Sequence, residues 1–410
     1  MRSLTALLLG LIVAGCSGVD AGASAASAPP ASAASPAATT AASPVASAAA
    51  TFAPPGSPPP GTARLEPVGG GAWFGLNLDW GSETAAAASA SLGRTPAVWV
   101  QFAPFPLDDA TRANLDLFIE QVEAVGGMAV LTLEPHDGLD AVTDAAAADL
   151  ADLLAGYWTH HGVATFVRFA HEMNGSWYPW GQDPVRYVEA FRRVADAVHE
   201  RAPGAAMLWA PNHGGGYPFS GGAFEAQTGS AAAEALDTNR DSTVTAADDP
   251  YEPYYPGDDA VDWVGMSLYH WGLEYPWGEN ELPRPGTFAA MLRGEDVGAH
   301  GTPAGVPDFY ATYADGHDKP LAIVETGILF DPASSRGPTG AELKSAWFGE
   351  VFGPATRDAF PRIGMLNWFE WRKDEPEVGR TIDWRLGVDP TVARELLEAM
   401  PAGWLRFAND

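Results

Sequence analysis

The sequence is poor in cysteine and in basic residues. Its single cysteine, Cys16, excludes a disulfide framework and a cysteine-rich zinc site in this chain of 410 residues. Lysine and arginine together number 23 against 52 aspartate and glutamate residues, which gives a net charge of −29. This balance argues against nucleic acid as a partner, because phosphate binding needs basic side chains. The only unbroken apolar run lies at the N-terminus, so no interior membrane-spanning helix is predicted.

The N-terminal residues predict targeting rather than a fold. Arg2 precedes an apolar run over 4–14, which suits the core of a signal peptide and is short for a membrane span. The run ends in Val-Ala-Gly-Cys, which resembles the lipobox of bacterial lipoproteins. We therefore expect a signal peptide over 1–15 and a lipid on Cys16, which would anchor the protein outside the cytoplasm, at the cell surface or the outer membrane. The alternative is an ordinary secretion signal with an incidental cysteine.

Residues 16–66 are mostly alanine, serine, proline and threonine, with few large apolar side chains. Such a segment buries too little apolar surface to offset its ordering entropy, so we expect a disordered linker. The few charges before residue 67 cancel, so the acidic excess belongs entirely to 67–410. We expect these residues to form one domain and the protein to be a monomer.

Eight short β-rich segments alternate with helical material over 67–410. A helix is predicted over 184–202, where apolar residues recur at helical spacing after an initial proline. Eight alternations predict the α/β class and a (β/α)₈ TIM barrel. The alternative, an open doubly wound sheet, would carry a glycine-rich phosphate loop after the first segment, and the sequence there has none. The expected strands are 73–78, 97–102, 128–133, 165–170, 206–210, 263–268, 321–324 and 363–368.

Two of these strands lead directly into a glutamate at their C-terminal end. Glu172 follows the fourth strand and Glu325 follows the seventh. Functional residues of such barrels lie at the C-terminal ends of the strands. Two carboxyl groups across a barrel mouth suit retaining glycoside hydrolysis, in which one protonates the leaving oxygen and the other attacks the anomeric carbon. For either glutamate alone, a solvated or salt-bridged carboxylate is the alternative.

The sequence around Glu172 also resembles a known family. Residues 168–175, Arg-Phe-Ala-His-Glu-Met-Asn-Gly, and 177–181, Trp-Tyr-Pro-Trp-Gly, resemble the strand-four signature of glycoside hydrolase family 26. The resemblance covers roughly 70–400 and implies a (β/α)₈ barrel, a β-linked polysaccharide substrate, and no cofactor for catalysis. It further implies that Glu172 is the acid/base and Glu325 the nucleophile. Supporting motifs are 208–212, 262–265, Tyr269, 324–327 and 367–368.

Further substrate-binding residues are expected around the two glutamates. Tyr269 is predicted to donate its hydroxyl to Glu325, and His171 is predicted to donate a hydrogen bond near the reacting sugar. Ordinary packing is the alternative role for both. Because aromatic rings stack on the apolar faces of sugars, Trp177 and Trp368 are the predicted platforms beside the cleavage point. The other candidates are Asn212, Glu134, His136, Trp180, Trp371 and Arg372.

The end of the third strand differs from the pattern of the family's mannanases. Those enzymes carry a Trp-His pair, whereas Glu134 holds that place here and His136 is displaced. An endo-acting β-1,4-mannanase is the leading prediction, and mixed-linkage β-1,3-1,4-glucan and β-1,3-xylan stay open as substrates. A non-catalytic polysaccharide-binding lipoprotein is the alternative of another class. The presence of both glutamates argues against it, because binding alone does not need them.

An insertion over 237–248 resembles a calcium-binding loop of the EF-hand or dockerin type. Oxygen ligands fall at the first, third, fifth and twelfth positions, and serine occupies the usual glycine position. A bound Ca²⁺ would be structural, because retaining hydrolysis needs no metal. The alternative is an acidic surface loop. The predicted ligands are Asp237, Asn239, Asp241, the Thr243 carbonyl and Asp248.

Overall fold

The computed structural model describes residues 64–275, 277–295, 306–408 and 410. The predicted signal peptide, Cys16 and all but the end of the predicted linker lie outside these residues, so the lipid anchor stays a prediction. The described fold begins at Arg64, three residues before the expected start of the domain. Among the described residues, no helix is both long enough and apolar enough to cross a membrane.

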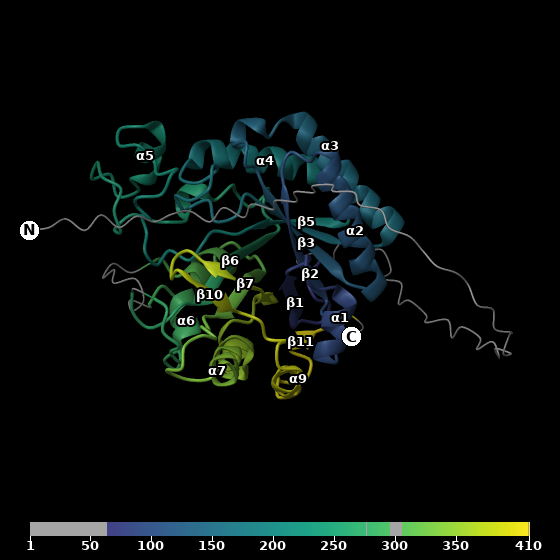
Figure 1. Ribbon diagram of the computed structural model, residues 1–410. Coiled ribbons are helices and arrows are strands. Elements are labelled where there is room, and N and C mark those ends of the chain that lie inside the picture. Colours follow the sequence, from purple (N-terminus) through teal and green to yellow (C-terminus); the bar gives the residue numbers. More distant parts are fainter. Residues whose placement is uncertain (1–63, 276, 296–305, 409) are drawn as a thin grey trace, which may run out of the picture.

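Within the described residues, eight parallel strands form a closed barrel with helices around it (Figure 1), which confirms the predicted (β/α)₈ fold. Each strand pairs with the next along the chain, and β1 also pairs with β8, which closes the barrel. The strands are β1 (Ala72–Leu78), β2 (Val98–Pro104), β3 (Met128–Glu134), β4 (Thr165–Phe169), β5 (Ala205–Trp209), β6 (Trp263–His270), β7 (Leu321–Ile328) and β8 (Ile363–Glu370).

Helices cover the outside of the barrel. Figure 1 shows α3 and α4 on one side and α7 and α9 on the other. The predicted helix over 184–202 is confirmed as α4, which Asp183 caps by accepting a hydrogen bond from the Arg186 amide. The α-helices are α1 (Ala85–Leu92), α2 (Asp109–Val125), α3 (Asp144–Gly156), α4 (Pro184–Arg201), α5 (Ala231–Leu236), α6 (Thr287–Leu292), α7 (Gly340–Phe352), α8 (Pro354–Ala359) and α9 (Pro390–Glu398). Short 3₁₀ turns are η1 (Leu139–Ala141) and η3 (Glu252–Tyr254), and π turns are η2 (Tyr157–His161) and η4 (Tyr310–Asp315).

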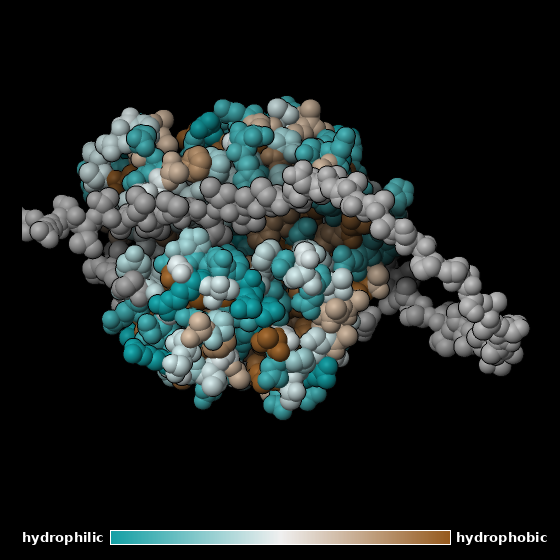
Figure 2. Space-filling model, in the orientation of Figure 1, coloured by the Kyte–Doolittle hydropathy of each residue, from teal (hydrophilic) through white to brown (hydrophobic). Residues whose placement is uncertain are grey.

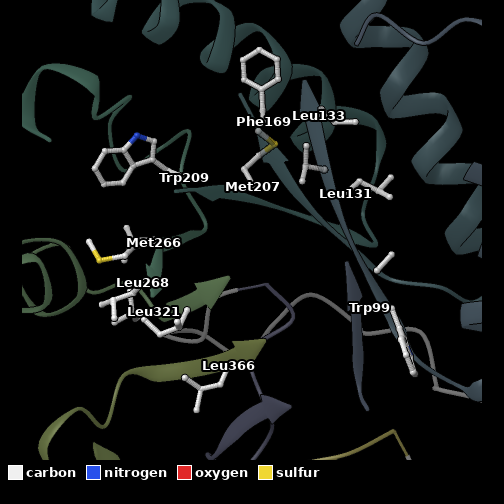
Figure 3. Packing of buried hydrophobic residues seen from close by; sticks show 14 of the residues in the cluster. Trp99, Leu131, Leu133, Phe169, Met207, Trp209, Met266, Leu268, Leu321 and Leu366 are labelled. Atoms are coloured by element: carbon white, nitrogen blue, oxygen red, sulfur yellow. The ribbon is translucent and has the colours of Figure 1, made fainter. Parts of the chain in front are cut away.

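Buried apolar residues alternate between two layers along each strand. Val130 and Phe166 belong to a cluster made of strand residues inside the barrel. Leu131, Phe169 and Met207 belong to the larger cluster that also contains helix residues, and Figure 3 shows them gathered on neighbouring strands beneath the helices. This two-sided burial explains why the strands read as near-continuous apolar runs.

Two tryptophans close the N-terminal end of the barrel. Trp263 is fully buried, and its indole Nε1 donates to the Arg64 carbonyl at 2.6 Å. Its ring meets that of Phe166 edge-on, with centroids 5.2 Å apart. Trp73 Nε1 donates to the Leu65 carbonyl at 2.9 Å. The segment before β1 is therefore fixed across the end of the barrel that lies opposite the C-terminal strand ends.

Three further strands were not predicted. β9 (Arg372–Glu375) and β10 (Arg380–Asp383) form an antiparallel hairpin after β8, and β11 (Leu405–Arg406) pairs with the start of β1. β9 reads Arg-Lys-Asp-Glu, which contains no apolar residue and so gives no alternation to detect. The hairpin lies next to the C-terminal ends of the strands because it follows β8 directly.

The molecular surface is mostly hydrophilic on the face that Figure 2 shows. Arginines pair with carboxylates on the surface, as Arg192 does with Asp259 and Arg201 with Asp152, each at 2.6 Å. Since acidic residues outnumber basic ones by more than two to one, such pairs leave the domain strongly negative. Because of this negative excess, we expect the domain to repel polyanions such as nucleic acid.

Replacing Trp263 by alanine is expected to lower the free energy of unfolding by about 3–5 kcal/mol, because it leaves a cavity in a closed barrel end. Val185, 50 % exposed on α4, offers a control: Val185→Ala should change that free energy by less than about 0.5 kcal/mol. Urea unfolding followed by far-UV circular dichroism measures both. Equal unfolding midpoints for the two variants would contradict the structural role of Trp263.

Candidate active site

A sharp turn after β4 carries Glu172 to the open end of the barrel. Ala170 and Glu172 have φ angles of +47° and +53°, in a backbone region that costs free energy for residues other than glycine. The Glu172 amide donates to the Ala210 carbonyl at 3.0 Å, just after β5. The Asn174 side chain bonds both the amide and the carbonyl of Asn212, at 2.9 and 2.8 Å. These bonds hold the strained turn, and with it Glu172, in one position.

Glu325 lies within β7, opposite Ser267 of β6. Arg168 of β4 is fully buried and donates one guanidinium N–H to Glu325 and another to the Ser267 hydroxyl, the latter at 2.7 Å. The Tyr269 hydroxyl donates to the other Glu325 oxygen at 2.6 Å, so the predicted hydrogen bond between these two residues is present. Donors on both oxygens therefore fix the orientation of the Glu325 carboxylate.

The surroundings of Glu172 differ from those of Glu325. Burial, followed by the negative charge of Glu325, raises the pKa of Glu172 to about 7. Arg168 and the side chains of Ser267 and Trp177 act in the opposite direction on this pKa. Trp177 Nε1 donates to the Glu172 carboxylate at 3.2 Å. The structure thus brings together Glu172, after β4, and Glu325, in β7, and places them in different surroundings.

His171 is buried beside this pair. Burial, together with the charge of Arg168, lowers the pKa of His171 well below its ordinary value, so the ring is neutral. Its centroid lies 5.0 Å from that of Tyr178 and 5.7 Å from that of Phe102. Within the described part of the chain, its Nδ1 has no hydrogen-bond partner. This atom is itself buried, so the predicted hydrogen bond from His171 to a sugar stays a prediction.

Trp180 was predicted to contact substrate, and this prediction is wrong. Its side chain is fully buried, and its Nε1 donates to the His171 carbonyl at 2.7 Å. Its ring stacks on Tyr178 with centroids 4.4 Å apart and planes at 12°. Trp180 thus supports Tyr178 and His171 from behind, while the half-buried Tyr178 faces the open end.

The prediction of Trp368 as a sugar platform is also wrong. Trp368 is fully buried, with its ring 6.0 Å from Phe348 of α7, and its Nε1 donates to the Trp384 carbonyl at 2.9 Å. The reason is strand alternation: Asn367 and Phe369 face into the barrel, so the residue between them faces the helices. Although Trp368 lies near the C-terminal end of β8, its side chain does not face the open end of the barrel.

The other candidates from β3 and β5 lie at the open end. Glu134 is the last residue of β3, and its carboxylate is 3.4 Å from the exposed His136 ring. The hydrogen bond to Glu134 raises the pKa of His136. His136 in turn lies 5.5 Å from Trp180, so both residues belong to the surroundings of the strand-four turn. Asn212 is half-buried and pairs with Ser267 of β6.

Trp371 and Arg372 lie where β8 leads into β9. Trp371 is half-buried, and its Nε1 donates to the Asn77 side chain at the end of β1, at 3.1 Å. Its ring is parallel to that of Phe369, with centroids 5.9 Å apart. Arg372 is exposed on the hairpin. The structure thus places Trp371 at the mouth and Arg372 at its rim.

Sequence reasoning missed Ser267, Trp384 and Glu375. Ser267 could have been found, because it lies two residues before Tyr269 and shares its face of β6. Trp384 packs its ring on Tyr269, with centroids 5.2 Å apart, and donates to the Glu375 carboxylate at 2.7 Å. Burial raises the pKa of Glu375 to about 7. This support could not be predicted from the sequence, since it depends on the hairpin of β9 and β10, which was not predicted.

The loop over 237–248 is held by its own hydrogen bonds. Asp237 and Asn239 both accept from the Asp241 amide at 2.9 Å, which draws their oxygens to one turn. Asp241 accepts from the Thr243 amide, and the buried Asp248 accepts from the Asn239 amide. Among the described residues, no group of three or more His, Cys, Asp or Glu side chains is placed to hold a metal ion. Calcium binding therefore stays a prediction.

A melting measurement with Ca²⁺ and with a chelator tests the calcium prediction. Bound calcium would raise the melting temperature through mass action, and Asp241→Ala would remove that rise. Glu234, exposed on the neighbouring α5, provides the control variant Glu234→Ala, which should respond to calcium as the wild type does. If chelation shifts neither the wild type nor the variants, the loop is an acidic surface loop stabilised by hydrogen bonds.

The raised pKa of Glu172 predicts a pH-dependent cost in stability. The folded state binds this proton more tightly than the unfolded state does, so the contribution of Glu172 is most favourable below about pH 4.5 and is lost as pH rises to about 7. Glutamine carries no titrating proton and so avoids this loss. The difference in the free energy of unfolding between Glu172→Gln and the wild type should therefore be about 1–3 kcal/mol more favourable to the variant at pH 8 than at pH 4.5. The exposed Glu120 of α2 supplies the control, Glu120→Gln. Urea titrations at the two pH values measure the difference, and equal gains at both would rule out the assigned proton.

Comparisons with known proteins agree with the fold. No model of a protein family matches the chain. Over 251 residues it is 24 % identical to Endoglucanase H of Acetivibrio thermocellus, and the match covers 59 % of this chain but only 21 % of that relative.

Among solved structures it is similar to a modular endo-β-1,4-mannanase of Cellulomonas fimi, described with the family 26 mannanases, with a TM-score of 0.52 and 17 % identity. That similarity covers 83 % of this chain and 72 % of the mannanase. A double mutant of a Cellulomonas fimi endo-β-1,4-mannanase gives the same TM-score at 18 % identity, over 83 % of this chain and 73 % of its own. The chain therefore has the fold of a family 26 mannanase, as the sequence resemblance implied.

Proposed function

We propose that this protein is a retaining glycoside hydrolase that cleaves within β-linked polysaccharide chains, with β-1,4-mannan as the leading substrate. The observation that carries the proposal is the pair Glu172 and Glu325. These carboxyl groups lie after β4 and within β7 and interact electrostatically. Burial and the charge of Glu325 raise the pKa of Glu172, whereas Glu325 accepts hydrogen bonds from Arg168 and Tyr269. An acid/base role requires a carboxyl group with a raised pKa, as Glu172 has, and a nucleophilic role requires a second carboxyl group held in position by donors, as Glu325 is.

In the first step, Glu325 attacks the anomeric carbon of the bound sugar. The bond between that carbon and the glycosidic oxygen breaks, and the oxygen takes the proton of Glu172. A pKa of about 7 lets Glu172 hold this proton at neutral pH. Arg168 and Tyr269 orient Glu325 for attack through their hydrogen bonds. The product of the step is a glycosyl ester on Glu325.

In the second step, water attacks the same carbon, and Glu172 accepts the proton of that water. Esterification removes the negative charge of Glu325, which is one of the two causes of the raised Glu172 pKa. The pKa of Glu172 therefore falls in the intermediate, as a general base requires. The ester bond breaks, both carboxyl groups return to their starting states, and the sugar keeps its anomeric configuration.

The substrate class is supported by charge and by the comparisons. A neutral polysaccharide needs no basic patch, which agrees with the net charge of −29. Half-buried Trp177 and Tyr178 offer ring surface beside Glu172 for stacking on sugars. The fold is that of an endo-β-1,4-mannanase, and the relative found by sequence is named an endoglucanase. Mannan and β-glucan are therefore the first two polymers to test, followed by β-1,3-xylan.

Replacing Glu325 by alanine is expected to reduce turnover of the polymer at least about a thousandfold, because no nucleophile remains. Glu172→Ala should lose turnover of the polymer similarly. On an aryl glycoside whose phenol leaves without protonation it should keep much of kcat/KM, while kcat falls because the second step lacks its general base. On the polymer, the wild type should lose kcat/KM as pH rises through about 7, and Glu172→Ala should not show this loss on the aryl glycoside. Initial rates on mannan, mixed-linkage glucan and β-1,3-xylan measure these effects.

The exposed Glu120 serves as the matched control, since Glu120→Ala should keep wild-type rates. Wild-type hydrolysis by Glu325→Ala on every polymer would overturn the assignment of the site. If the wild type binds these polymers and cleaves none of them, the protein is a polysaccharide-binding protein instead of an enzyme.

A further inference from the structure

A row of aromatic rings leads away from Glu325 along the loop after β6. Tyr269, which donates to Glu325, lies 6.3 Å from Trp271 between ring centroids. Trp271 lies 5.7 Å from Trp277, and Trp277 lies 5.1 Å from Tyr275. Each ring thus contacts the next, from the candidate nucleophile to the outer surface.

The outer part of this row is exposed. Tyr275 is 61 % exposed, and Trp271 and Trp277 are half-buried. Burial of large aromatic side chains lowers the free energy. A contiguous set of exposed rings is therefore unfavourable in the free protein. A ligand that covers the rings would remove this cost.

The loop that carries the row is braced on several sides. Glu281 accepts a hydrogen bond from the Leu273 amide at 2.9 Å, and Arg380 of β10 donates to the Gly278 carbonyl at 2.8 Å. Asn280 exchanges two hydrogen bonds with the backbone of Asp331, which follows β7. Rings held in place before binding lose little conformational entropy when a ligand arrives.

Trp384 adds a contact from the hairpin. Its ring meets Trp271 edge-on, with centroids 5.0 Å apart, and also packs on Tyr269. Since Trp384 is itself fixed by its hydrogen bond to Glu375, the inner half of the row shares its support with Glu325. Packed rings and one hydrogen bond therefore connect the row to Glu325.

The charges beside the row restrict what can bind. Glu274 and Glu279 are exposed on the same loop, next to Tyr275 and Trp277. Carboxylates repel anionic polymers, whereas they accept hydrogen bonds from hydroxyl groups. Aromatic faces bordered by hydroxyl acceptors suit a neutral sugar chain.

We propose that Tyr269, Trp271, Trp277 and Tyr275 form a row of sugar-binding subsites that extends the active site along the loop after β6. The occupant is the continuation of the neutral β-linked polysaccharide whose bond is cleaved at Glu172 and Glu325. This proposal rests on the proposed function, because continuity with Glu325 identifies the occupant. It predicts a preference for long chains, which the catalytic pair alone would not give.

The experiment compares Tyr275→Ala and Trp277→Ala with the wild type on oligosaccharides of increasing length. Probes are β-1,4-linked manno- and gluco-oligosaccharides of three to six units and a short aryl glycoside. We expect kcat/KM on the longest probe to fall about threefold to tenfold, with no change on the aryl glycoside. Tyr275→Phe, which keeps the ring, should retain wild-type values. Leu117→Ala is the matched control, because Leu117 is also 61 % exposed but lies on α2.

The same loss on every probe, or no loss on any, would overturn the row as a set of subsites. Circular dichroism of each variant checks that the fold is kept. If the wild type cleaves none of the probes, the proposed function fails, and calorimetric binding of the six-unit probes then decides on the row. Weaker binding by Tyr275→Ala with unchanged binding by Leu117→Ala supports it, and equal binding by both contradicts it.

Discussion

The arrangement of the open end of the barrel depends on one buried cation. Arg168 is fully buried within β4, where an unpaired charge would be very costly, and its guanidinium is bonded to Glu325 of β7 and to Ser267 of β6. These bonds tie three strands together across the mouth. After burial, which is the larger cause, the same charge lowers the pKa of His171, and it opposes the rise in the pKa of Glu172. A residue that contacts no solvent therefore influences the charge state of both neighbours.

The balance of charge at this point explains why the two glutamates differ. One cation faces two carboxyl groups, and it bonds directly to Glu325. Glu172 is left with burial and a negative neighbour, which together raise its pKa to about 7. In the proposed function, Glu172 supplies the proton and Glu325 the attacking carboxylate of a double displacement. Trp180 supports His171 and Tyr178 of the turn that carries Glu172, and Trp384 packs on Tyr269, which donates to Glu325.

Much of the fold and the centre of the site could be predicted from the sequence. Apolar runs identified all eight barrel strands, and the glutamates after the fourth and seventh strands are the pair that the structure brings together. The errors came from residues whose role depends on direction or on distant contacts. Trp368 was assigned by its nearness to a strand end, although alternation turns it toward α7. Trp180 belongs to the strand-four motif, yet its ring fills space behind Tyr178. The first strand of the hairpin, β9, has no apolar pattern, so the hairpin could not be predicted. The contact between Trp384 and Tyr269 depends on that hairpin and could not be predicted either.

In the proposed mechanism, Glu325 forms a covalent bond with the sugar. The most direct test is incubation with a 2-deoxy-2-fluoro-β-glycoside that carries a good leaving group. The fluorine slows both steps and the leaving group speeds only the first, so the glycosyl ester accumulates. Mass spectrometry of the intact protein and of its peptides then locates any adduct. We expect one glycosyl unit per chain, attached to Glu325 and released slowly once the reagent is removed. Attachment to another residue, or turnover of the polymer with inversion at the anomeric carbon, would contradict it.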